Sequence, residues 1–186
     1  INEERYNDLY AFDTQQQRWS RLSPSPMEGR GGPGLCVIGN GQESSLVVAA
    51  GFCGRPMADV WQYRIASDEW LPRTDWTLPV ARSIFACGTL TSDSAGETVE
   101  ICMFGGELEN YDAALIEKGQ DPTLQASMYS SETLLLQSTS SDSSIRIIEL
   151  GPSSPSARGW TAGCSACVDG IRCFVVFGGV REGYEG

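Results

Sequence analysis

Because this chain contains no histidine, any chemistry it performs must use carboxylates, arginine, tyrosine, tryptophan or cysteine. The absence excludes serine and cysteine triads, two-histidine zinc sites and histidine-ligated copper. Three arginines, Arg30, Arg82 and Arg158, each open an apolar run that ends in small residues. Glu107 directly follows one of these runs. A ring of arginines with a carboxylate is typical of an anion pocket or a metal pocket.

An internal repeat indicates which elements position these residues. The segment 8–12 returns 51 residues later as the segment 59–63, and each copy is followed by a tryptophan. The segment 132–136 is a weaker third copy. The arginine unit repeats as well, and the first residue of its small pair follows the arginine 20, 23 and 20 positions later. A period of about 50 residues with these features resembles the Kelch repeat of β-propellers.

The repeat predicts an all-β fold, a Kelch-type β-propeller that is incomplete, with about three blades of antiparallel four-stranded sheet. The single domain, residues 1–186, then contains the outer strands of a first blade (1–22), a blade (30–73), a blade (82–150) with a long loop (107–131), and the inner strands of a further blade (158–186). Strands are expected near residues 35–38, 46–50, 59–64, 83–90, 99–104, 132–137, 145–149, 161–168 and 172–177.

The repeat frame starts on the third strand of one blade and stops after the second strand of another. Both ends would then expose strand edges and blade faces. We therefore expect the remaining blades of its own chain as one partner, and these 186 residues alone to be poorly stable or self-associating. Trp61 and Tyr63, with their counterparts Tyr10 and Phe12, are expected to be buried between adjacent blades.

Charge and hydropathy narrow the classes of partner. A net charge of -11 would repel a phosphate backbone, so we expect no nucleic acid partner. The longest apolar run, residues 46–53, is too short to span a bilayer, so we expect no membrane partner. The chain shows no secretory leader, and most of its seven cysteines lie in apolar runs. This pattern indicates buried, reduced thiols and a cytoplasmic location.

Propeller geometry predicts that the candidate residues gather at one mouth of the central channel. The first two strands of a blade are antiparallel, so the first begins where the second ends. The three arginines open first strands, and Glu107 follows a second strand. The connection from the small pair to the third strand is 18 residues longer after Gly106 than after Gly51. A long loop at the mouth indicates either a functional loop or a tolerated surface insertion.

Four motifs that follow one another along the chain extend the resemblance from the Kelch repeat to one family. They are Arg30-Gly31-Gly32-Pro33-Gly34-Leu35, Arg82-Ser83-Ile84-Phe85-Ala86, Phe104-Gly105-Gly106-Glu107 and Ser156-Ala157-Arg158-Gly159-Trp160-Thr161-Ala162. Over residues 7–181 the chain resembles the plant specifier proteins, which are the nitrile-specifier, epithiospecifier and thiocyanate-forming Kelch proteins. These proteins redirect the breakdown of glucosinolate aglycones to nitriles, epithionitriles or thiocyanates.

The resemblance implies a ferrous iron site at the propeller mouth and a lyase activity if that site is retained. Glu107 matches the first ligand of the family, and Asp112 is the second candidate, with Glu109 as its alternative. The family's histidine ligand is absent, and Glu117 is the nearest further oxygen donor. The site is therefore expected to be degenerate, with weak or absent Fe(II) binding. Arg30, Arg82, Arg158 and Trp160 match the catalytic pocket residues of the family.

Two alternatives stay open. Without metal, Glu107 and Asp112 would pair with Arg82 or Arg158 in a structural network. The chain could also be a non-catalytic Kelch module for protein–protein interaction. The expected partner at the mouth is accordingly a small anionic substrate or a protein.

Two further motifs are interpreted as structural. Gly29, Gly31 and Gly34 match the dinucleotide fingerprint in spacing, but prolines precede them and a strand-like run follows, whereas a phosphate cradle needs a strand before and a helix after. Cys164 and Cys167 lie three apart on an expected strand and so point to opposite faces. We expect these cysteines to be buried small side chains.

Overall fold

The computed structural model describes residues 4–92, 95, 98–109, 128–139, 141–148 and 154–181, and the fold is an all-β, Kelch-type β-propeller with an incomplete set of blades. A first hairpin consists of β1 (Leu9–Asp13) and β2 (Arg18–Leu22). The next blade has β3 (Gly34–Ile38), β4 (Ser45–Phe52), β5 (Pro56–Arg64) and β6 (Glu69–Pro72). The blade after it has β8 (Ala86–Ser92), β9 (Val99–Phe104), β11 (Thr133–Ser138) and β12 (Ser143–Ile148). The last hairpin consists of β13 (Ala162–Val168) and β14 (Ile171–Phe177).

Four short elements of the described chain lie between these strands. They are the 3₁₀ turns η1 (Gly41–Glu43) and η2 (Thr74–Trp76) and the two-residue strands β7 (Arg82–Ser83) and β10 (Glu107–Leu108). Two of them, β7 and β10, extend the sheet of the β3–β6 blade at β5. The single strand expected near 83–90 is divided into β7 and β8, because Ile84 between them has a left-handed backbone with φ of 51°. The remaining expected strands are confirmed within a few residues at each end over the described part of the chain.

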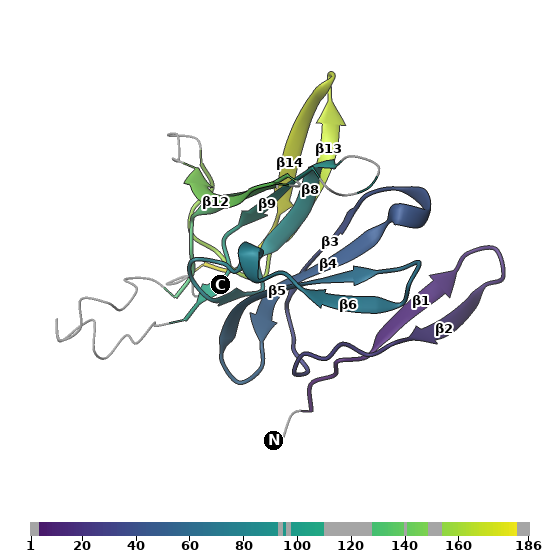
Figure 1. Ribbon diagram of the computed structural model, residues 1–186. Helices are drawn as coiled ribbons and strands as arrows, with labels where there is room; N and C mark the ends of the chain where they lie inside the picture. The colour runs from purple at the N-terminus through teal and green to yellow at the C-terminus, as the bar shows by residue number, and fades with distance from the viewer. Residues whose placement is uncertain are drawn as a thin grey trace.

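The two hairpins lie at opposite ends of the arrangement (Figure 1). The purple β1–β2 hairpin lies beyond β6, and the yellow β13–β14 hairpin lies against β8. The inner strands β3 and β8 also contact each other, as expected where neighbouring blades meet at the channel. Within each complete blade, every strand pairs antiparallel with the next.

The core lies between the two complete blades. Val47 and Ile101, on second strands, and Leu134, on a third strand, are fully buried in one apolar cluster. Trp76, in the connection between the blades, joins this cluster with 1% of its surface exposed. Packing of blade on blade therefore supplies the apolar burial that drives folding.

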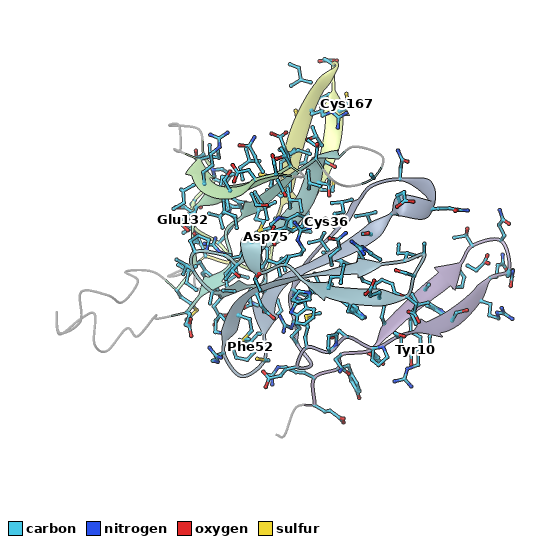
Figure 2. The ribbon with its side chains drawn as sticks, in the orientation of Figure 1. Tyr10, Cys36, Phe52, Asp75, Glu132 and Cys167 are labelled. Carbon is cyan, nitrogen blue, oxygen red and sulfur yellow. The ribbon has the colours of Figure 1, made fainter. Side chains whose placement is uncertain are left out.

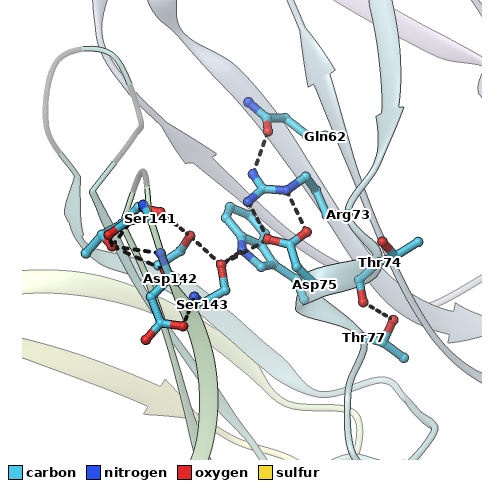
Figure 3. A network of polar contacts seen from close by, with 11 residues as sticks. Gln62, Arg73, Thr74, Asp75, Thr77, Ser141, Asp142 and Ser143 are labelled. Carbon is cyan, nitrogen blue, oxygen red and sulfur yellow. Dashed lines mark hydrogen bonds and ion pairs between the residues drawn. The ribbon is translucent and has the colours of Figure 1, made fainter.

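Polar contacts also join the two blades beside Trp76 (Figure 3). The Arg73 guanidinium lies 3.5 Å from the centroid of the Trp76 ring and pairs with Asp75 at 2.9 Å. Asp75 in turn accepts a hydrogen bond of 2.9 Å from the Ser143 hydroxyl on β12. A cation over an indole and a cross-blade hydrogen bond both stabilise this contact between blades.

The expected burial of the aromatic repeat is confirmed for Tyr63, which is 1% exposed, and is wrong for Tyr10 and Phe12, which are 49% and 45% exposed. Trp61 is half-buried. The reason is positional, since Tyr63 lies in a blade packed between neighbours, whereas Tyr10 and Phe12 lie on a two-stranded hairpin. Within the described residues that hairpin has no inner strands beside it.

All seven cysteines are free thiols. Cys36 on β3 and Cys87 on β8 are buried and hydrogen-bonded to each other, as the prediction of buried thiols requires. Cys164 and Cys167 are exposed, so their expected burial is wrong. They lie on β13, which packs against β8 but remains mostly exposed along its length. Figure 2 shows Cys167 on the β13–β14 hairpin. In the described part of the chain, no helix has the length and hydropathy to cross a bilayer.

Candidate functional site

The three predicted arginines make the same contact in successive blades. A guanidinium nitrogen donates to the carbonyl oxygen of the first residue of the small pair that ends the second strand. The distances are 2.9 Å from Arg30 to Ala50, 3.1 Å from Arg82 to Gly105 and 3.2 Å from Arg158 to Gly178. Each Nε atom also donates to the carbonyl two residues before its own arginine. The repeated spacing of 20, 23 and 20 residues is therefore a repeated hydrogen bond.

In the two complete blades the arginine also binds a carboxylate on or next to the third strand. Arg30 makes a bidentate pair with Asp59 at 2.7 and 3.1 Å. Arg82 pairs with Glu132 at 2.9 Å. We call each set of arginine, carbonyl and carboxylate an arginine clamp, since it joins three strands of one blade. Arg158, the third member, has no carboxylate partner among the described residues.

These contacts leave Arg30 and Arg82 with few donors for binding a ligand. The Arg30 side chain is 6% exposed and that of Arg82 is fully buried. Their donors are taken by carbonyls and carboxylates of their own blade. Bidentate pairing of this kind leaves little of the guanidinium for a ligand. The geometry therefore gives these two arginines a role in holding each blade together.

A cavity of about 660 Å³ lies where the segments that open the first strands of three successive blades come together, and we call it the mouth cavity. Equivalent residues of three successive blades line it, together with residues that follow the small pairs. The lining residues are Arg5, Gly31, Gly32, Pro33, Phe52, Ser83, Ile84, Phe85, Glu107, Trp160, Thr161 and Ala162. Of the predicted site residues, the structure brings Glu107 and Trp160 to this cavity. The three arginines are not among its lining residues, and Arg158 borders a separate cavity with Ser156 and Gly179.

Backbone strain marks the rim of this cavity. The residue two positions after each arginine has a positive φ, which is 56° at Gly32, 51° at Ile84 and 56° at Trp160. Only glycine adopts this conformation without cost, and for a β-branched residue such as isoleucine it is unusual. Ile84 is held there by a hydrogen bond of 2.8 Å from its N–H to the carbonyl of Gly32. A side chain at position 32 would begin 2.5 Å from Ile84 Cγ2, so this contact requires glycine.

Glu107 is the half-buried carboxylate of the mouth. Its backbone pairs with Ser83, as Phe52 pairs with Gly31 and Val180 with Gly159 in the neighbouring blades. Among the described residues its side chain has no ion pair with Arg82 or Arg158. The expected pairing with one of these arginines is therefore wrong, because Glu132 takes the carboxylate position of the Arg82 clamp.

Trp160 and Phe52 supply aromatic surface to the lining of the cavity. The Trp160 side chain is 66% exposed. The Phe52 ring lies under the Arg5 guanidinium, whose carbon atom is 4.9 Å from the ring centroid. The mouth thus combines apolar walls with two charged side chains, Arg5 over the Phe52 ring and Glu107, which has no ion pair in the described structure.

The described residues do not form a metal centre. No three of the cysteine, aspartate and glutamate side chains in the described part of the chain come together in a way that could hold an ion. Asp112 and Glu117 lie outside the described residues. Glu109, the alternative second ligand, lies 3.6 Å from Arg55 as an exposed ion pair. Among the described residues, Glu107 is the only carboxylate that lines the cavity, and one carboxylate alone does not fit a ferrous site.

A second, polar cavity of about 1030 Å³ lies near the η1 turn and the turn before β12. Its lining includes Gln62, Arg73, Asp75 and Ser143, which form the network between the blades. Because these groups already bind one another, we interpret them as a structural contact between the blades and not as a ligand-binding site.

Comparison with known proteins agrees with this architecture. The chain is similar to YjhT, a Kelch-type propeller protein of known structure, with a TM-score of 0.58 and 17% sequence identity. The matched region covers 95% of this chain and 45% of YjhT, so the chain spans less than half the length of that protein. The likeness establishes a Kelch-like β-propeller fold. No protein-family model matches the chain, and these comparisons give no support to membership of the specifier family.

Sequence reasoning missed the carboxylates of the clamps and the left-handed Ile84. A signal for the carboxylates was present, since Asp59 and Glu132 both open the copies of the aromatic segment. Each copy of the aromatic segment begins with an acidic residue, and each arginine unit begins with an arginine. This pattern indicates that the two residues form an ion pair within each blade. The left-handed backbone has no such signal, because isoleucine normally avoids it.

The first clamp predicts a pH dependence of stability. Burial opposes the ionisation of Asp59, but hydrogen bonds from Arg30 and Trp61 outweigh it, so the pKa of this carboxyl lies below its usual value. A lowered folded-state pKa adds stability that is fully present above the unfolded pKa of about 4 and is lost as pH falls through the folded pKa. We expect Asp59→Asn to destabilise the protein at neutral pH and the difference from wild type to shrink at acid pH.

Thermal unfolding followed by circular dichroism from about pH 7 to about pH 3 measures this difference. Asp169→Asn, in the exposed turn between β13 and β14, is the matched control and should show no such trend. A difference between wild type and Asp59→Asn that stays constant with pH would show that the Arg30 clamp does not depend on the ionised carboxylate.

Proposed function

We propose that this chain belongs to a protein-binding propeller, and that the mouth cavity binds a partner segment with a basic side chain next to an apolar one. Propeller faces commonly serve as binding surfaces, and the cavity lies where loops of three blades converge. The site is formed by residues at equivalent positions of successive blades, so its shape follows from the repeat.

One observation carries this proposal, namely that Glu107 faces an apolar cavity with no ion pair among the described residues. A half-buried carboxylate in apolar surroundings gains most from a cationic partner that also brings hydrogen bonds. Exposed Trp160 offers an aromatic face for an apolar or cationic side chain. The net charge of -11 attracts a basic segment and disfavours an anionic substrate.

Selection from a random peptide library on the immobilised chain tests the proposal. We expect enrichment of peptides with lysine or arginine beside an aromatic or aliphatic residue. Glu107→Lys should abolish this preference and favour acidic peptides. Trp160→Ala should weaken the binding of the selected peptides at least about tenfold. The control is Glu109→Lys, which reverses a neighbouring charge outside the cavity. Equal enrichment on Glu107→Lys and wild type would overturn the proposal.

The specifier-type lyase is the second candidate, and the position of Glu107 and Trp160 at the mouth favours it. It requires Fe(II) to bind through Glu107 with Asp112 or another donor outside the described residues. Anaerobic calorimetry with Fe(II), on the chain and on Glu107→Gln, separates the two functions. We expect weak binding or none, and tight binding that depends on Glu107 would favour the lyase over the binding module.

A further inference from the structure

Ser23 lies at a polar contact between the β1–β2 hairpin and the turn that joins β5 to β6. Its hydroxyl donates a hydrogen bond of 2.7 Å to the carboxylate of Asp68, and its backbone N–H donates to the same carboxylate at 3.2 Å. Its carbonyl oxygen accepts a hydrogen bond of 3.0 Å from the indole of Trp70. The hydroxyl of Tyr63, on β5, also donates to Asp68. We call these four residues the Ser23 latch, because they hold the end of β2 against the neighbouring blade.

The latch is built around an anion. Hydrogen bonds from Tyr63 and then from Ser23 hold the pKa of the Asp68 carboxyl below its usual value, so this group is ionised at neutral pH. Asp68 is exposed, and in the described structure its partners are neutral donors without an ion pair. A negative charge placed on Ser23 would therefore meet the Asp68 carboxylate with no cation between them.

A serine–aspartate hydrogen bond also holds the next pair of blades at the equivalent place. There Asp75, in the segment that follows β6, accepts a hydrogen bond of 2.9 Å from the Ser143 hydroxyl at the start of β12. Ser23 follows β2 as Asp75 follows β6, since β1 and β2 correspond to β5 and β6 in the repeat. In both cases the segment after an outer strand binds the outer hairpin of the next blade. The Ser23 latch is thus one of the contacts by which successive blades are joined.

The segment after β2 has the features of an acceptor for phosphoryl transfer. Pro24 directly follows Ser23, and both Pro24 and Arg21 are exposed. Proline has no N–H and disfavours a helical conformation in the residue before it, so a Ser-Pro pair presents its hydroxyl on an extended backbone. Proline-directed protein kinases recognise serine in this context. Ser23 itself is half-buried, because its hydroxyl lies against Asp68.

We propose that Ser23 is a phosphorylation site and that its phosphate opens the Ser23 latch. A proline-directed protein kinase transfers the γ-phosphoryl group of ATP to Ser23 Oγ, and ADP and the hydroxyl proton are released. The modified Oγ no longer donates a hydrogen bond, and the phosphate adds a charge of about −1.5 to −2 at neutral pH. Loss of the donor and repulsion from Asp68 both release the end of β2 from the β5–β6 turn.

The released segment leads to the mouth cavity. Residues 23–29 connect the latch to Arg30, and Gly31 and Gly32, which follow, line that cavity. Phosphorylation of Ser23 therefore acts on the chain that enters the binding surface, whatever ligand the mouth cavity takes.

Incubation of the folded chain with ATP and a proline-directed protein kinase, followed by mass spectrometry, tests the site. We expect phosphate on Ser23. Ser25 is the internal comparison, because it is also followed by proline but is only 7% exposed. A peptide of residues 18–29 should accept phosphate on both serines, since neither is then buried. Absence of phosphate from Ser23 of the folded chain would overturn the proposal, whether or not the peptide reacts.

Amide hydrogen exchange measures the opening of the latch. Phosphorylation should speed exchange at the backbone N–H of Ser23, which donates to Asp68, at least about tenfold, and should leave β9 in the core unchanged. Ser23→Asp should act in the same direction, and Ser23→Ala should act less, because it removes the donor without adding charge. Ser67→Asp, at an exposed position of the β5–β6 turn, is the matched control for added charge and should leave Ser23 protected.

A second substitution distinguishes the latch from general destabilisation. Asp68→Asn should restore protection to Ser23→Asp, because the new amide can donate to the new carboxylate. This rescue also shows that Ser23→Asp is folded. Unchanged exchange at Ser23 after phosphorylation, or a Ser23→Asp variant that Asp68→Asn does not rescue, would overturn the proposed opening.

Discussion

Replacement of Arg82 by methionine is expected to lower the free energy of unfolding by about 3–5 kcal/mol, the usual cost of removing one partner of a buried ion pair. Arg82 is fully buried, and it donates to the carbonyl oxygen of Gly105 and to Glu132. The substitution leaves both acceptors without this donor, while the apolar volume is largely kept. The lost free energy of unfolding therefore measures the contribution of the clamp to stability.

Denaturant unfolding of Arg82→Met, followed by tryptophan fluorescence and circular dichroism, gives this value. Arg55→Met is the control, because Arg55 is exposed and its only ion pair within the described residues is a long one with Glu109. The control should change stability by less than about 0.5 kcal/mol. A loss below about 1 kcal/mol for Arg82→Met would mean that the clamp contributes no more than an ordinary hydrogen bond.

The Trp76→Ala substitution is expected to lower the free energy of unfolding by about 3–5 kcal/mol, which is typical for truncating a buried aromatic side chain. Trp76 is buried in the core between the blades, and its Nε1 donates to the Ser143 hydroxyl at 3.3 Å. The ring also supports the Arg73 guanidinium. Truncation removes apolar contact, a hydrogen bond and a cation–π contact at one point of the blade interface.

Chemical unfolding of Trp76→Ala, beside Trp19→Ala as a matched tryptophan truncation, measures this contribution. Trp19 is 66% exposed on β2, so its loss should cost clearly less. Equal losses at the two positions would show that packing between the complete blades is not what stabilises the chain.

The secondary structure of this chain could be predicted because its determinants are local. Strand β9, Val99–Phe104, was predicted with the same bounds, from an apolar run that ends at Gly105-Gly106. The alternation that places Val60 and Gln62 on one face of β5 is a property of any strand. The period of the repeat then set the order of strands in each blade.

The partners of the site residues could not be predicted in the same way. From the sequence, Glu107 was expected to pair with Arg82 or Arg158 in the absence of metal, but the structure pairs Arg82 with Glu132, 50 residues along the chain. Both carboxylates lie near a strand end of the same blade. The choice between them depends on where the third strand is held, which is a matter of sheet geometry rather than of sequence distance.

The sequence by itself thus determined the all-β class, the blade frame and the positions of the arginines, because periodicity and glycine spacing act over a few residues. The tertiary structure decided that Arg30 and Arg82 close clamps within their blades, and that Glu107 and Trp160 line the cavity. It also decided the left-handed backbone of Ile84. A strained conformation of this kind persists only where surrounding contacts impose it, and here these contacts come from Gly32 in the neighbouring blade.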